Sequence, residues 1–553
     1  MNRINLRSLT FLLFFIFGTI HWYLFLNFGD PTFKTFDWKH TYQVHDIIKQ
    51  SVKELKIPYH VSMFDAPNII PKDSKSIYEA ENGSYDIRYL SSGNNHVSPH
   101  LILFIFFDIP TMMFLNILVF FSIGLWGILC WIKKFNLSIP ASFFLFIIWS
   151  FNGFIVTRMG VGHLGSCSGY LVIPMFFWLL YRFIEKEKLK WQDHVINTIL
   201  FSFFIFFVKL NANGINVYQM ILVTSAFFLF YPKLWIWYFA SMFLSFLLMI
   251  FYIIPTFLFS SYIGAGERVM EAGYGVSMIN TGNLEMGIQK IIYHFYDIIW
   301  HIWRSLTVPY NAKFGDSWEW SLYVSYFGLF LLIIISFSFF KKNFKKFAVN
   351  NISIFYACCL IIVYSISSVA RELHFFLSDY ISMPLPDRRA NRVIVYPLSV
   401  IFLISAISFD STFNILHSKI RVFIKYLSII VLTYYLITYS YNWFVFSVES
   451  NADLILENLD TRKNFKTNIL DMPNDKTYIN IINISYLISF VTFLISLFVF
   501  FISKKIKYLS RLSYNKFISC IRYNIIIKIK NLRNCFLSNL ICIDIYGCKF
   551  WRR

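Results

Sequence analysis

Long apolar runs dominate this chain, and its polar residues gather between them. A helix needs about 20 mainly apolar residues to cross the hydrocarbon core of a bilayer. Runs of that kind predict an all-α polytopic membrane protein with about 12 transmembrane helices. Their approximate positions are 8–28, 111–132, 138–156, 168–184, 195–212, 215–231, 234–260, 320–340, 349–368, 393–409, 424–441 and 481–503.

The composition excludes a set of soluble domains. Hydrophobic residues make up 57% of the 553 residues and charged residues 14%, against about 25% charged in an average soluble domain. So much apolar side chain cannot be hidden inside soluble cores. Disorder is excluded as well, because it requires low hydrophobicity.

The net charge of +20 is explained by topology and does not indicate nucleic acid. Lysine and arginine are enriched in cytoplasmic loops of membrane proteins. With the N-terminus inside, every short inside loop is basic, including the KKNFKK run at 341–346, and so is the tail after residue 503. The bias predicts that both termini lie in the cytoplasm.

The polar residues of the chain therefore lie mostly in outside loops. The core, residues 1–410, has outer loops at 29–98, 261–318 and 369–392, and residues 283–306 have the pattern of an amphipathic helix. Residues 411–503 form the C-terminal spans with an outer loop at 442–480, and 504–553 form a basic cytoplasmic tail. We expect the chemistry at the outer face.

The first outer loop contains two early acids, Asp30 and Asp37. A helical pattern follows over 41–56, with apolar Val44, Ile47, Ile48, Val52 and Leu55 on one side, and Pro58 ends it. A carboxylate at the edge of the low-dielectric region suits proton removal or metal binding. A solvated loop acid is the alternative interpretation.

Basic residues near the predicted outer surface form a second group. Arg388, Arg389 and Arg392 stand at the outer start of a span, where the positive-inside rule does not explain them. Arginine binds phosphate bidentately, so an anion site is one interpretation, and contact with lipid headgroups or pairing with Asp387 is the other. For Arg158 and Lys209, at span ends, snorkelling to the interface is the simple explanation.

Several of these features together resemble one known family. A first span precedes a large outer loop with an early Asp, an amphipathic helix and a Pro, and a Gly-His motif follows later. The arrangement resembles the GT-C superfamily of polytopic glycosyltransferases, especially its bacterial YfhO-like branch. The local matches are Ser150-Phe151-Asn152-Gly153-Phe154, Gly162-His163-Leu164, Pro174, Gly273-Tyr274-Gly275, Trp318-Glu319-Trp320, Tyr326-Phe327-Gly328, Arg389 and Arg392.

The resemblance implies a polyprenyl-phosphate sugar as donor and a loop-one carboxylate as general base. Asp37 is then the best-placed base, with Asp30 second. The remaining implied site residues are Gln43 at the start of the amphipathic helix, His163 and Glu319 lining the cleft, and Arg388, Arg389 and Arg392 holding the lipid phosphate. Some members use a divalent metal, but the first loop has no Asp-Glu or Asp-Asp pair, which argues against one here.

The expected function is sugar transfer to a glycan, lipid or protein acceptor at the outer face of a bacterial plasma membrane. Two alternatives stay open. One is a transporter or flippase of a lipid-linked glycan, which predicts polar residues deep within broken spans. The other is an outer-face glycan polymerase or ligase.

Overall fold

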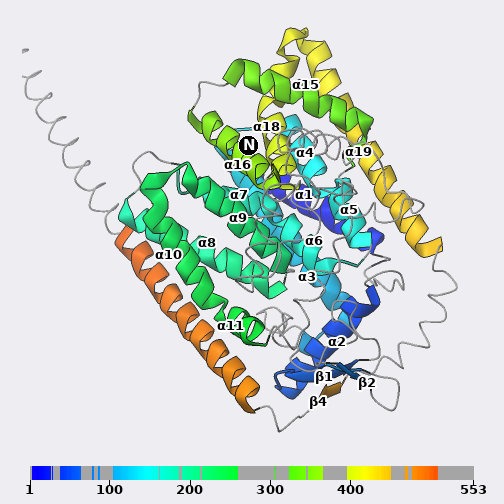
Figure 1. Ribbon diagram of the computed structural model, residues 1–553. Helices are drawn as coiled ribbons and strands as arrows, with labels where there is room; N and C mark the ends of the chain where they lie inside the picture. Colours follow the sequence, from blue (N-terminus) through cyan, green and yellow to red (C-terminus); the bar gives the residue numbers. More distant parts are fainter. Residues whose placement is uncertain are drawn as a thin grey trace, which may run out of the picture.

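The chain is a helical bundle with one small β-sheet (Figure 1). The computed structural model describes residues 3–26, 28, 38–63, 77–79, 85–87, 104–160, 162–185, 190–211, 214–259, 306, 323–343, 347–364, 395–449, 468–470 and 476–507. Statements below refer to these residues.

Helices account for most of the described chain. The first nine are α1 (Arg3–Phe25), α2 (Trp38–Glu54), α3 (Ile109–Phe135), α4 (Ile139–Ser150), α5 (Gly153–Gly160), α6 (Leu164–Leu171), α7 (Ile173–Tyr181), α8 (Trp191–Asn211) and α9 (Gly214–Leu229). The others are α10 (Trp235–Leu248), α11 (Ile250–Leu258), α15 (Ser325–Asn343), α16 (Phe347–Tyr364), α18 (Val395–Thr412), α19 (Ser418–Glu449) and a last helix, Lys476–Lys507. Short 3₁₀ turns, Pro232–Leu234 and Phe413–Ile415, lie before α10 and after α18.

Six helical segments among the described residues are long and apolar enough to cross a bilayer: Ile109–Phe135, Ile139–Gly160, Trp191–Leu210, Val395–Thr412, Ser418–Phe444 and Lys476–Lys507. Each coincides with one of the predicted runs, so those six predictions are confirmed at the level of length and composition. The chain is a multi-pass membrane protein, and the apolar side chains on the outside of the bundle fit contact with lipid.

The other six predicted spans are helical but shorter or broken. The apolar stretches Leu9–Phe25, Ser325–Ser338 and Asn351–Leu360 each fall short of a full span in the described residues. The run at 168–184 divides into α6 and α7 at Val172. The helices Asn216–Leu229 and Pro232–Leu248 are bent by 120° relative to each other and count together as at most one further span.

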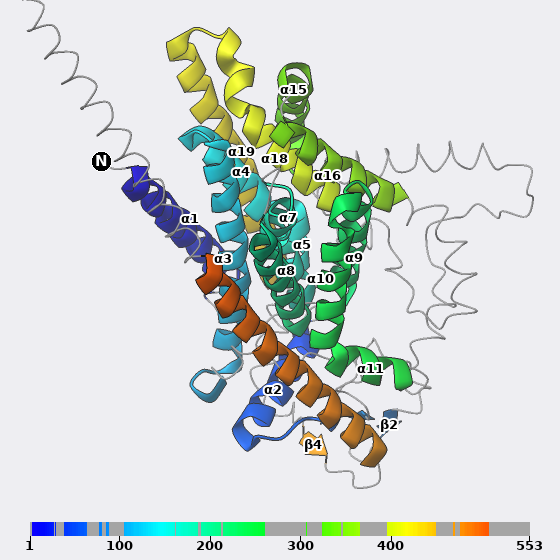
Figure 2. The same cartoon turned by 90° about the vertical axis from the view of Figure 1, so that its left-hand side faces the viewer.

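Burial distinguishes the centre of the bundle from its lipid-facing edge. The span Ile139–Gly160, which comprises α4 and α5, has 83% of its most apolar window buried inside the protein. For Ser418–Phe444 the share is 22%, and for Lys476–Lys507 it is 17%. The last helix accordingly runs along the outside of the bundle (Figure 2).

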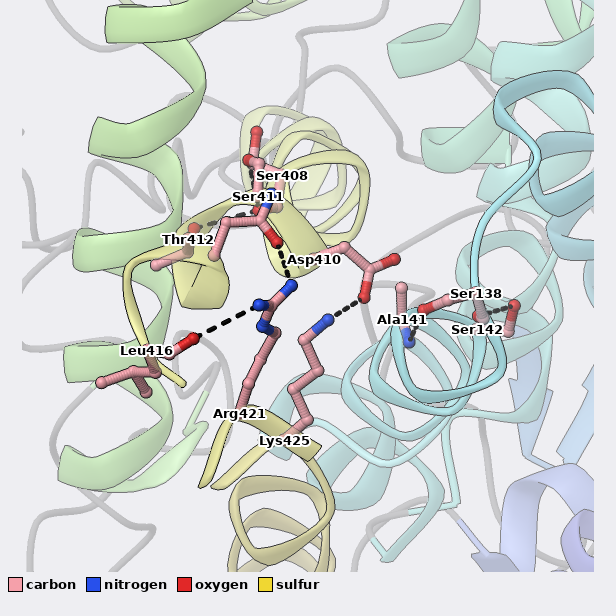
Figure 3. Close-up of polar contacts among 11 residues, drawn as sticks. Ser138, Ala141, Ser142, Ser408, Asp410, Ser411, Thr412, Leu416, Arg421 and Lys425 are labelled. Carbon is pink, nitrogen blue, oxygen red and sulfur yellow. Dashed lines mark hydrogen bonds and ion pairs between the residues drawn. The ribbon is translucent and has the colours of Figure 1, made fainter. Parts of the chain in front are cut away.

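Polar contacts join segments that the positive-inside rule places on one side of the membrane. Lys134, in the last turn of α3, pairs with Glu185, after α7. Lys507, at the end of the last helix, pairs with Asp193 at the start of α8. Where α18 turns into α19, Lys425 pairs with Asp410 beside the start of α4 (Figure 3). These contacts agree with the predicted alternation of the chain, while its absolute direction stays a prediction.

A four-stranded antiparallel sheet lies beside α2, at the end of the bundle remote from the α18–α19 turn (Figure 2). Its strands are β1 (His60–Met63), β2 (Ile77–Glu79), β3 (Tyr85–Ile87) and β4 (Asn468–Leu470), in the order β2-β3-β1-β4. In the register, Ser62 is opposite Asn468. Two loops predicted to be outside, 29–98 and 442–480, thus meet in one sheet that the apolar pattern did not predict.

Candidate functional site

The first turn of α2 is docked on the turn between α5 and α6. The Trp38 indole Nε1–H donates to the Gly160 carbonyl oxygen at 2.9 Å. The Thr41 hydroxyl donates to the Gly162 carbonyl oxygen at 2.8 Å. Trp38 is fully buried, as are Ile47 and Ile48 further along the helix. The predicted amphipathic helix therefore exists and packs on the bundle.

The C-terminal end of α2 differs from the prediction. Leu55 was expected on the apolar face, but its backbone is in the left-handed region with φ of 53° and its side chain is 90% exposed. The helix has already ended at Glu54, so helical spacing no longer decides which way the next side chain points. The apolar face of α2 stops one turn before Pro58.

Gly162 allows this docking. Its φ is +82°, which residues with a Cβ rarely adopt. A Cβ built on Gly162 would lie 2.6 Å from the Trp38 backbone nitrogen, well inside van der Waals contact. The Gly-His motif therefore has a structural basis, because its glycine lets α2 approach the backbone closely.

A break in the span Ile139–Gly160 sets the start of α5. The Asn152 side-chain oxygen accepts from the backbone N–H groups of Phe154 at 3.1 Å and Ile155 at 3.4 Å. Its amide nitrogen donates back to the Trp149 carbonyl oxygen at 2.9 Å. Asn152 thus caps α5 and satisfies backbone groups on both sides of the break.

Gly153 brings another segment to the same break. Its N–H donates to the Tyr323 carbonyl oxygen at 2.8 Å, and a Cβ on Gly153 would lie 2.6 Å from the Tyr323 nitrogen. The Tyr323 ring in turn packs against Tyr439 of α19, with centroids 4.7 Å apart. The segment that follows the Trp318-Glu319-Trp320 motif is therefore fixed against α5 and α19.

Two basic residues meet beside the α5–α6 turn, Arg158 in the last turn of α5 and His163 just before α6. The Arg158 Nη1 and the His163 Nδ1 are 3.1 Å apart, and the Arg158 guanidinium carbon lies 5.1 Å from the centre of the Phe154 ring. Arg158 is 0% exposed, whereas His163 is partly exposed. Lys209 of α8 is also buried, and its ammonium lies over the Tyr252 ring. Snorkelling to an interface is therefore the wrong explanation for both bases.

The thiol next to this pair is not suited to nucleophilic chemistry. Cys167 is buried, and its Sγ lies 3.6 Å from the Ile155 carbonyl oxygen. Burial raises the pKa of the Cys167 thiol, and the nearby Arg158 charge offsets only part of that shift. Because the thiolate is the nucleophile, a thiol that stays protonated is inert.

Two of the predicted site residues lie in the described chain. His163 stands in the α5–α6 turn, and Gln43 lies on α2, two residues after Thr41. The structure thus brings together two of the sequence motifs, the Gly-His turn and the helix of the first loop. The remaining candidates lie outside the described residues, and their convergence stays a prediction: Asp30, Asp37, Glu319, Arg388, Arg389 and Arg392. The 283–305 segment and Gly273-Tyr274-Gly275 also lie outside them.

Sequence reasoning missed three residues that build this site. Trp38 and Thr41 supply the contacts of α2, and Arg158 supplies the charge behind His163. One signal was available for Arg158, since glycines at 160 and 162 follow it and predict that the helix ends there, which puts Arg158 in the last turn beside the Gly-His motif. In the part of the chain that the structure describes, no three His, Cys, Asp or Glu side chains gather as metal ligands.

Comparison of the chain with protein-family models, with curated proteins and with solved structures finds no match.

Proposed function

We propose that the protein is a membrane glycosyltransferase of GT-C-like architecture whose active site lies at the α2 end of the bundle. In this proposal both termini lie in the cytoplasm of a bacterial cell. The α2 end then faces outward, and the donor is a polyprenyl-phosphate sugar. The acceptor is a glycan, lipid or protein.

One observation carries the proposal. The helix that directly follows Asp37 in the sequence docks its first turn on the turn containing His163, through the Trp38 and Thr41 hydrogen bonds. Two motifs more than 100 residues apart, which the resemblance assigns to one site, are therefore neighbours. This is the arrangement expected when a loop-one carboxylate works beside a Gly-His turn.

The proposed roles follow from chemistry. Asp37, or Asp30 in second place, removes the proton of the acceptor hydroxyl. The cluster of Arg388, Arg389 and Arg392 holds the lipid phosphate and stabilises the charge that develops on it as the sugar leaves. Gln43, His163 and Glu319 complete the surroundings of the sugar.

The test uses the full chain in lipid vesicles with a panel of undecaprenyl-phosphate sugars and a short glycan acceptor. The readout is release of undecaprenyl phosphate. Asp37→Asn is expected to lower the rate at least about 100-fold, the usual loss for a general base. Asp46→Asn, a carboxylate on α2 that accepts from Gln50, is the matched control and is expected to retain most of the rate.

If both variants keep the wild-type rate, Asp37 is not the base, and the same comparison with Asp30→Asn then tests the second candidate. Absence of transfer by the wild-type protein with every donor in the panel would count against the enzyme proposal itself.

A transporter of a lipid-linked glycan is the second candidate, because the structure contains buried polar groups beside broken helices. Gln219 of α9 is 1% exposed, and among the residues that the structure describes neither polar atom of its amide has a hydrogen-bond partner. One turn earlier, the Asn216 side chain lies against Gly169 of α6. The backbone carbonyl oxygen of Asn216 accepts a hydrogen bond from the Tyr396 hydroxyl of α18. A buried amide without a partner is costly, and a passing sugar hydroxyl would satisfy it.

Gln219→Leu separates the two candidates. A transporter that uses this amide is expected to move a fluorescent lipid-linked disaccharide between vesicle leaflets much more slowly after the substitution. A glycosyltransferase acting at the α2 end is expected to keep its transfer rate. Asn351→Leu, a buried amide on α16 whose oxygen accepts from Tyr231, serves as the control for loss of a polar core residue.

A further inference from the structure

Arg158 contacts His163 at two points, one on the ring and one on the backbone. The Arg158 Nη1 faces the His163 Nδ1 at 3.1 Å. The His163 backbone N–H donates to the Arg158 carbonyl oxygen at 3.1 Å. The same residue thus fixes both the backbone and the ring of His163.

The chemistry of the two groups decides where the ring proton lies. A guanidinium carries five N–H donors, has no acceptor and does not lose its proton in proteins. At 3.1 Å the Arg158 Nη1–H must therefore be the donor, and the His163 Nδ1 must accept with its lone pair. A neutral imidazole with an unprotonated Nδ1 carries its proton on Nε2.

We infer that Arg158 is a positioning residue that holds His163 in its neutral Nε2–H form, so that His163 serves as a hydrogen-bond donor and not as a proton acceptor. Protonation of Nδ1 would place two N–H groups against each other. Nε2 already carries its proton and cannot take up another. Whichever oxygen His163 meets, it meets that oxygen with Nε2–H.

Arg158 is well placed for such a role because it cannot easily turn away. Its side chain is completely buried, and its guanidinium lies over the Phe154 ring. Both residues belong to α5, whose start is fixed by the Asn152 cap. The positive charge behind the imidazole also polarises its Nε2–H, which strengthens a hydrogen bond to an anionic or carbonyl oxygen.

The use of this donor in sugar transfer rests on the proposed function, whereas the protonation state of His163 does not. In glycosyl transfer, the inference assigns His163 to orienting or stabilising an oxygen of the substrate. It leaves removal of the acceptor proton to a carboxylate.

The direct test is ¹⁵N NMR of the full chain, labelled at histidine and embedded in lipid vesicles at neutral pH. Subtracting the spectrum of His163→Gln isolates the resonances of His163. We expect a pyridine-type Nδ1 and a pyrrole-type Nε2. A pyrrole-type Nδ1, or two pyrrole-type nitrogens, would overturn the inference without any activity measurement.

Two matched substitutions test the role of the donor. The amide nitrogen of His163→Gln can occupy the place of Nε2–H, whereas the amide oxygen of His163→Asn can accept from Arg158 at the place of Nδ1. If the donor matters, the Gln variant is expected to transfer sugar at least about 10-fold faster than the Asn variant. If His163 only anchors Arg158, the order reverses and the donor role is wrong.

The outcomes keep the two proposals apart. The expected NMR pattern without any sugar transfer by the wild-type protein supports the neutral Nε2–H form of His163 and counts against the glycosyltransferase. Sugar transfer by a wild-type protein whose His163 has a pyrrole-type Nδ1 supports the glycosyltransferase and overturns the inference about Arg158. Arg158→Lys provides a further check, because a lysine that still donates to Nδ1 is expected to retain the Nε2–H form.

Discussion

At Gly162, a single hydrogen atom in place of a methyl group lets α2 reach the bundle. The residue combines a left-handed backbone with a close approach to Trp38, and each feature alone would favour glycine. Trp38 and Thr41 of α2 donate hydrogen bonds to the carbonyl oxygens of Gly160 and Gly162, so the path of this short turn decides whether the helix docks.

Gly162→Ala is expected to lower the free energy of unfolding by about 1–3 kcal/mol, the cost of a residue forced into a sparsely populated backbone region. Thermal unfolding in detergent measures it, and proteolysis near α2 reports undocking. Gly328→Ala in α15 is the control, because its new methyl group would meet the flexible tip of the Leu432 side chain of α19 at 3.0 Å. Equal losses in both variants would contradict a special role for Gly162.

The limits of prediction are also clearest at single residues. The spacing of apolar positions placed α2 correctly, but it could not show that the chain turns at Leu55 and exposes it. Likewise, a base near a span end has two options, snorkelling or burial. For Arg158 the choice depends on how α2, α5 and α6 meet, which hydropathy does not contain.

At the scale of elements, the breaks in the helices carry more information than their lengths. Six apolar runs became uninterrupted or nearly uninterrupted spans, whereas the run at 168–184 is divided at Val172, just before Pro174. A hydropathy window averages across such breaks. The break at Asn152 is of the same kind, and it places Arg158 and His163 at the turn where α2 docks.

Asn152→Ala is expected to cost about 0.5–2 kcal/mol of stability, the range for losing a helix cap, because the N–H groups of Phe154 and Ile155 lose their acceptor. Asn152→Ser keeps a capping oxygen and is expected to recover part of the loss. The measurement is the unfolding midpoint of each variant in the same detergent. A serine variant no more stable than the alanine variant would argue that Asn152 acts through its amide nitrogen instead.

At the scale of the whole molecule, contacts between distant loops agree with the topology derived from charge. The pairs Lys134–Glu185 and Lys507–Asp193 join segments predicted to be inside, and strands β1 and β4 join loops predicted to be outside. The pattern of lysines and arginines could predict this alternation. The sheet itself could not be predicted, because its strands are only three or four residues long.

A cross-link tests the sheet and the direction of the chain together. Ser62→Cys and Asn468→Cys are opposite each other in the register, within the range of backbone separations that a disulfide spans. With the eight native cysteines replaced by serine, we expect the pair to cross-link spontaneously in cells if the sheet faces the oxidising side. Mass spectrometry of the tryptic peptides identifies the bond.

The control pair is Ser62→Cys with Lys419→Cys, since Lys419 lies at the α18–α19 turn, at the other end of the bundle. It is expected not to cross-link. A Ser62–Asn468 bond that forms only after an oxidant is added to opened cells would place the sheet on the cytoplasmic side and reverse the proposed orientation.

The sheet also constrains the order in which the protein can be completed during synthesis. Strand β3 ends at Ile87 and β4 begins at Asn468, so about 380 residues separate the two parts of the sheet. At about 5–20 residues per second, their synthesis takes on the order of 20–80 s. During that time β1 has an unpaired edge, which is a hazard for wrong pairing. A nascent chain of this protein would therefore be most dependent on chaperones on the side of the membrane where the sheet forms.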